Sequence, residues 1–233
     1  MLVIRMFPFS WALVLLVLAG CSSNDDKALN EFSRAYSGFH SRAEEVNTCA
    51  RMPLDNEGHF WTALKEAVDT STSDADRVDA ATAAIGAYRT DVVPMMAVCA
   101  SFVQSMDTSV GTLIEAANRI KNDQLRFEAV GIAKHSRALQ VAFSLLLPLY
   151  QQRLEMTTNM LNDELRAKGV PSKFLFNHRT DAITALRKET DNKWQEVASA
   201  WRDTEDAFSA LKGKTKLTDY SSKVNAEPTK DPQ

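Results

Sequence analysis

Four histidines and a few pairs of carboxylates are the residues in this chain that come closest to metal ligands or acid–base groups. The histidines are His40, His59, His135 and His178. His40 and Glu44 lie four positions apart, which puts them on one face of a helix at a spacing that metal ligands use. A zinc or di-iron centre would need a second pair of the type His-x-x-x-His or Glu-x-x-His, and none completes the set. We therefore predict histidines on solvated surfaces, with no metal site and no cofactor.

Motifs for phosphate binding and for nucleophilic catalysis are incomplete. Gly213-Lys214-Thr215 matches the end of a phosphate loop, but Phe208 stands where the first glycine is required, and a helical pattern precedes the motif in place of a strand. No Gly-x-Ser-x-Gly elbow occurs, and the Glu44-Glu45 pair fits an ordinary solvated face. We predict no catalytic residues. An enzyme with its site in a bundle cleft, using His40 or His135 with nearby acids, is the less favoured hypothesis.

The N-terminus shows the order of features of a secretory signal. Arg5 is its single positive charge, residues 11–18 form an apolar run, and small residues precede Cys21. Residues 18–21, Leu-Ala-Gly-Cys, resemble the lipobox of bacterial lipoprotein precursors. The resemblance implies that residues 1–20 are a cleaved signal peptide and that Cys21 becomes the lipidated, palmitate-bearing first residue. The alternative is an uncleaved membrane anchor, although the apolar run is shorter than the roughly 20 residues that a bilayer span requires.

The residues that follow Cys21 suggest a destination. They are Ser22 and Ser23, with no Asp. In lipoproteins of the enterobacterial type, an Asp directly after the lipidated cysteine retains the protein at the inner membrane. The resemblance therefore implies the outer membrane, with the chain facing the periplasm. Several acyl chains would hold the protein far better than one myristoyl group, since each buried methylene contributes about 0.8 kcal/mol.

Cys49 and Cys99 are the two cysteines that remain once Cys21 is lipidated. A pair of cysteines in an oxidising compartment favours a disulfide. Closing a loop of about fifty residues stabilises a protein by ~4 kcal/mol in the chain-entropy model. The alternative is two separate buried thiols that pack as small apolar residues.

Trp194 and Trp201 lie seven positions apart and therefore share one helical face. Packing in the core explains such a pair most simply. The second hypothesis is that part of this face is exposed and binds a partner, because tryptophan is enriched at binding hot spots.

Composition and hydrophobic patterning indicate an all-α protein. The chain has 233 residues, a net charge of −3, and only 8 glycines and 7 prolines. It contains neither an alternating strand pattern nor an Asn-Gly or Asp-Gly hairpin signal. The mild charge is spread along the chain, so nucleic acid is not an expected partner. We predict an elongated antiparallel bundle of long, partly kinked helices over residues 26–212.

Caps and breakers predict the limits of the individual segments. Residues 21–25 are expected to be a short polar leash, and the first helix is expected to begin near Asp26 and end at Pro53. A turn at residues 55–58 and a short helix over residues 60–68 should follow. Ser73 is an expected N-cap for a helix from Asp74.

Breaker residues also predict the limits of the segments in the second half of the chain. Pro94 predicts a kink or break near residues 90–93, with a further segment over residues 110–121. A helix is expected from Gln124 to Lys168, then a stop at residues 169–171 that is followed by Phe174, Leu175 and Phe176. A last helix is expected from about Arg179 to Lys212, and residues 213–233 are expected to be a flexible tail.

These features support a function class but no named activity. The favoured hypothesis is a non-enzymatic, membrane-anchored envelope lipoprotein that acts as a helical binding or structural module and contacts an envelope protein in the periplasm. An immunity or inhibitor lipoprotein, directed against an envelope-targeted toxin or hydrolase, is the alternative.

Overall fold

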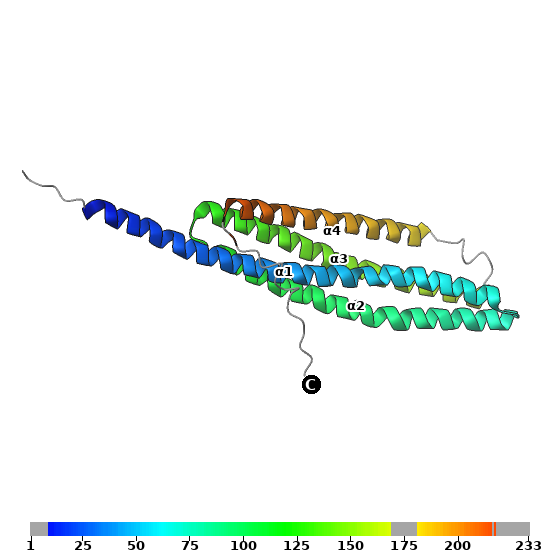
Figure 1. Cartoon of the computed structure of the whole chain (residues 1–233). Coiled ribbons are helices and arrows are strands. Elements are labelled where there is room, and N and C mark those ends of the chain that lie inside the picture. The colour runs from blue at the N-terminus through cyan, green and yellow to red at the C-terminus, as the bar shows by residue number, and fades with distance from the viewer. Residues whose placement is uncertain (1–8, 169–180, 216, 218–233) are drawn as a thin grey trace, which may run out of the picture.

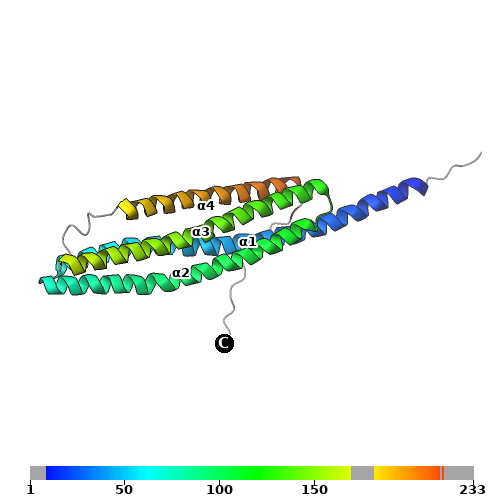
Figure 2. The same ribbon diagram turned by 180° about the vertical axis from the view of Figure 1, so that it is seen from behind.

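Four long helices make up the chain in a computed structural model that describes residues 9–168, 181–215 and 217. They are α1 (Phe9–Thr70), α2 (Asp74–Asn118), α3 (Asp123–Lys168) and α4 (Asp181–Lys214), and the described residues include no strand. The helices run alternately in opposite directions as an elongated bundle (Figures 1 and 2). The prediction of an all-α, elongated antiparallel bundle is confirmed.

The helices pack in the order of the chain. α1 packs most extensively on α2, α3 packs on α4, and α2 lies beside α3. We call the end with the α2–α3 turn (residues 119–122) the base, and the end with the α1–α2 turn (residues 71–73) the tip. The first turns of α1 project beyond the base (Figure 1).

α1 is longer at both ends than the sequence predicts. The helix includes residues 21–25, so the expected leash is helical, and it passes through Pro53 and residues 55–58, where a stop and a turn were expected. Both expectations were wrong. Proline costs a helix about 3 kcal/mol, but the buried stripe continues in register through Pro53, Glu57 and Phe60. Burial of this stripe against the other helices offsets the local cost.

α2 runs through Pro94 without a break, although a kink or break was expected there. Pro94 lies inside the helix, and the separate segment over residues 110–121 is simply the end of α2. Pro94 is exposed, so the carbonyl that its missing N–H leaves without an intrahelical partner faces water, where it is readily satisfied.

Other helix limits follow the sequence signals closely. Ser73 caps α2, and its hydroxyl accepts a hydrogen bond from the Asp76 N–H at 3.1 Å. Asn122 separates α2 from α3, and its side-chain oxygen accepts from the Leu125 N–H at 3.0 Å. α4 continues two residues past Lys212 into the expected tail. The stop at residues 169–171 and the phenylalanines that follow it lie outside the described residues.

The interior is divided into two apolar cores along the rod. The base core, which includes Phe32, Phe39 and Phe143, fills the half next to the α2–α3 turn. The tip core, which includes Phe60, Leu64 and Leu161, fills the other half. Charged residues of three helices lie at the junction.

Candidate functional site

The base of the bundle is where the predicted lipidation residue enters the fold. Cys21 lies in α1, one helical turn before Asp25. The Asp25 carboxylate accepts hydrogen bonds from the backbone N–H groups of Lys121, at 2.9 Å, and Asn122, at 3.4 Å. Asp25 thereby ties α1 to the α2–α3 turn, so the bundle begins four residues after the cysteine.

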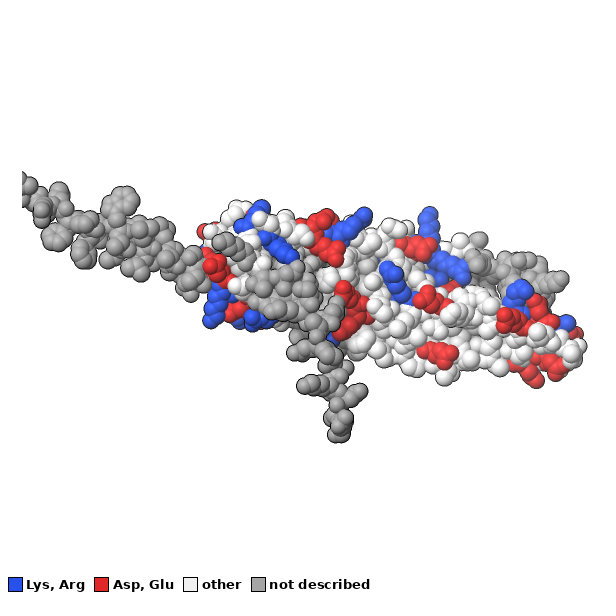
Figure 3. Space-filling model, in the orientation of Figure 1, with Lys and Arg blue, Asp and Glu red and all other residues white. Residues whose placement is uncertain are grey.

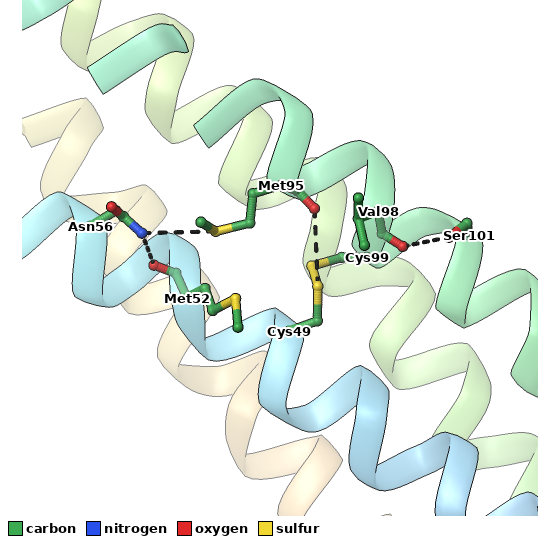
Figure 4. Close-up of a disulfide and its surroundings, with 7 residues drawn as sticks. All are labelled: Cys49, Met52, Asn56, Met95, Val98, Cys99 and Ser101. Carbon is green, nitrogen blue, oxygen red and sulfur yellow. Dashed lines mark hydrogen bonds between the residues drawn. A yellow bond between two sulfur atoms is a disulfide. The ribbon is translucent and has the colours of Figure 1, made fainter. Parts of the chain in front are cut away.

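Cys49 and Cys99 lie at bonding distance in the middle of the bundle. Their sulfur atoms are 2.06 Å apart and their Cα atoms 5.5 Å apart, which joins α1 to α2 as the sequence favoured (Figure 4). Both residues are buried. Figure 4 shows Met52 and Met95 flanking the disulfide, and the Asn56 amide nitrogen lies 3.8 Å from the Met95 sulfur.

Trp194 and Trp201 are half-buried on α4. The Trp194 indole N–H donates to the Tyr150 hydroxyl at 2.6 Å, and the Trp201 indole N–H donates to a Glu205 carboxylate oxygen at 2.8 Å. The Trp201 ring also meets the His40 ring edge-on, with centroids 5.4 Å apart. Both indoles thus contact the bundle itself, and their role in binding a partner stays a prediction.

His40 lies between two carboxylates. Its Nε2 atom is 3.2 Å from Glu205, and its Nδ1 atom is 3.6 Å from Glu44, the residue at ligand-like spacing in the sequence. His59 and His135 are exposed, and His178 lies outside the described residues. Among the residues with described positions, no group of three or more His, Cys, Asp or Glu side chains is arranged to hold a metal ion.

A buried charged cluster lies at the junction of the two cores. Glu57 of α1 pairs with Arg153 of α3, and Arg187 of α4 approaches the second Glu57 oxygen to 2.7 Å. Glu57 and Arg153 each expose about 8% of the side chain, and Arg187 exposes 21%. The Nε–H groups of both arginines are buried without an acceptor among the described residues. The cluster therefore links three helices at some cost in desolvation.

Sequence reasoning missed this cluster because it placed Glu57 in a turn. A signal was nevertheless present: Glu57 is spaced three residues before Phe60 and seven after Ala50, on the buried stripe of α1. An acid on an apolar stripe requires a buried partner, and Arg153, one residue before the buried Leu154, is its counterpart on α3.

Burial also changes the acidity of three tyrosines. It raises the pKa of Tyr36, Tyr88 and Tyr150 above the ordinary value of 10.0. The nearby Glu205 carboxylate raises the pKa of Tyr36 further, whereas the hydrogen bond from Trp194 partly opposes the rise in the pKa of Tyr150. These hydroxyls stay neutral at physiological pH, so they act as hydrogen-bonding and packing groups.

The fold and these sites define a disulfide-linked, antiparallel four-helix bundle with a buried ionic cluster. Comparisons with protein-family models, with curated proteins and with solved structures gave no match. Within the described residues, no helix combines the length and the apolar character needed to cross a membrane.

Proposed function

We propose that the chain is a non-enzymatic envelope lipoprotein, anchored through lipid on Cys21, whose bundle is a binding or structural module on the periplasmic side of the outer membrane. The observation that carries the proposal is the position of Cys21, one turn before Asp25, whose carboxylate caps the α2–α3 turn. An acyl group on Cys21 would bring the base of the bundle to the lipid surface.

The geometry gives such a module a defined reach. α1 continues from residue 21 to Thr70 without leaving the helix, which at 1.5 Å per residue is roughly 70 Å. The tip would stand this far from the membrane, and the sides of the rod would be available to an envelope protein in the periplasm.

Metabolic labelling with radioactive palmitate tests the anchor. Cys21→Ala should abolish labelling and leave residues 1–20 attached to the chain, because no lipidated cysteine then directs cleavage. A chain with both Cys49→Ser and Cys99→Ser is the matched control and should label normally. Undiminished label in Cys21→Ala would refute the proposal.

Sorting and partner binding need separate measurements. Ser22→Asp should move the protein from the outer to the inner membrane fraction, since an Asp directly after the lipidated cysteine retains lipoproteins of the enterobacterial type. Crosslinking in intact cells should trap one or two envelope proteins on the wild-type chain. An unchanged distribution of Ser22→Asp would argue against outer-membrane sorting, and the absence of any crosslinked envelope protein would argue against the binding role.

A further inference from the structure

The middle of α2 and the middle of α3 present a common surface without charged side chains. Residues 92–106 of α2 and residues 138–152 of α3 contain no Asp, Glu, Lys or Arg. Asp107 and Arg137, which directly border these segments, form an ion pair with each other and so place the two segments at the same level. Figure 2 shows α2 and α3 running side by side there. We call this surface the α2–α3 face. Figure 3 views the bundle from the opposite side, where charged side chains of both signs are spread over the surface.

A groove with apolar borders runs along the α2–α3 face. Its volume is about 520 Å³, and Val93, Ala97 and Ala100 of α2 line it opposite Ser144 and Pro148 of α3. Val93 is 50% exposed, and Val141 and Leu145 at the α3 border are 42% and 47% exposed. Large exposed apolar side chains in a contiguous, charge-free surface are typical of an interaction site.

Opposite charges mark the two ends of this face on both helices. On α2, Arg89 and Asp107 are separated by five helical turns and lie on the stripe that carries Val93 and Ala100. On α3, Arg137 and Glu155 are separated by the same interval on the stripe that carries Val141. Arg89 and Glu155 both line the groove near the tip.

We propose that the α2–α3 face binds a second copy of this chain, with the two rods parallel and related by a two-fold axis along their length. α2 of each copy then packs on α3 of the other. Arg89 meets Glu155 of the second copy, and Asp107 meets Arg137 of the second copy. The small side chains of Ala97 and Ala100 leave room for the partner helix at the centre.

The parallel orientation, although not the choice of face, rests on the proposed anchor at Cys21. Two chains held at their bases in one membrane stand side by side and point the same way. The face is roughly 27 Å long and two helices wide, near the lower size limit of stable interfaces. Anchoring in a membrane raises the effective concentration of each copy for the other, which compensates for a small contact.

Two valines of α2 with equal exposure provide the first test. Val93 is 50% exposed on the α2–α3 face, whereas Val98 is 49% exposed and lines the groove toward α1. Full-length protein in detergent should form dimers by sedimentation equilibrium. Val93→Lys should weaken dimerisation at least tenfold, and Val98→Lys should change it by less than about twofold. A wild-type chain that stays monomeric at about 1 mM, or equal effects of the two lysines, would overturn the proposal.

Exchanging the charges of Arg89 and Glu155 tests whether the two chains of the dimer are parallel. Arg89→Glu and Glu155→Arg should each weaken the dimer by about tenfold, since each replaces two attractions by two repulsions. The double variant should restore wild-type affinity in the parallel dimer. In an antiparallel dimer, Arg89 would face Asp107 and Glu155 would face Arg137, so the double variant would stay weak and overturn the parallel arrangement. Palmitate labelling of the same variants shows separately whether the anchor itself is present.

Discussion

Glu57 and Arg153 form an ion pair in the interior of the bundle, although 96 positions separate them in the sequence. Arg187, 130 positions from Glu57, completes the cluster from α4. Charged groups removed from water are costly unless they are paired, so only one axial alignment of α1, α3 and α4 satisfies all three side chains. We therefore expect the cluster to favour one register of these three helices.

Removal of the single acid from this cluster should be strongly destabilising. Glu57→Leu leaves two guanidinium groups in the interior without a counter-ion, and we expect the free energy of unfolding to fall by about 3–5 kcal/mol. Urea denaturation of the full-length chain measures the change. The triple variant Glu57→Leu, Arg153→Met and Arg187→Met should recover most of the loss, because it removes the charges together. A triple variant less stable than Glu57→Leu would contradict this account.

Stability should fall at alkaline pH because three tyrosines are buried. Burial holds the pKa of Tyr36, Tyr88 and Tyr150 above 10.0 in the folded chain, whereas in the unfolded chain they ionise near that ordinary value. Below pH 10 their contribution is constant, and above it the unfolded state loses protons first, so the folded state loses stability as pH rises. In a chain with Tyr220→Phe, which leaves these three as the tyrosines of the sequence, absorbance at 295 nm and helical circular dichroism should change together. Phenolate formation by these tyrosines in a fully helical chain would be inconsistent with the burial.

Reduction of the Cys49–Cys99 disulfide should lower stability without changing the fold. The bond closes a loop of 50 positions, for which the chain-entropy model gives about 4 kcal/mol. The double variant Cys49→Ser and Cys99→Ser should show the same loss as reduced wild type and be insensitive to dithiothreitol. Wild-type protein with equal thermal stability before and after reduction would exclude a bonded pair.

Asp25 should contribute to the stability of the base. Asp25→Ala removes an acceptor from two backbone N–H groups, and we expect a loss of about 1 kcal/mol, which lowers the melting temperature by about 2–4 °C in a chain of this size. Amide exchange at Lys121 and Asn122 should become faster. Asp26→Ala, at the next position, which is exposed, is the control and should leave both measurements unchanged.

The sequence identified the helices better than it identified their limits. Spacing of apolar residues predicted α3 and α4 to within two residues at the termini that the structure describes. Apolar residues at helical spacing can be buried together only when the segment is a helix that packs on the core. Neither Pro53 nor Pro94 ends its helix, since the packing of residues on either side of each proline outweighs the loss of one backbone hydrogen bond.

The candidate sites differ in how far the sequence could specify them. Cys49 and Cys99 could be paired because they are the only two cysteines left after Cys21. The Glu57 cluster could not be assembled, because it depends on the axial alignment of three helices, which no single stripe encodes. The α2–α3 face also required the structure, since its charge pattern becomes complementary only when two helices are placed at the same level.

α1 continues from residue 21 through Asp25 into the bundle as one uninterrupted helix, so no loop separates Cys21 from the rest of the rod. A change in the angle of the rod at the base would therefore be carried along its length to the tip. Over roughly 70 Å, a rotation of about 6° displaces the α1–α2 turn by about 7 Å. An anchor at the base would therefore also set the direction in which the tip points.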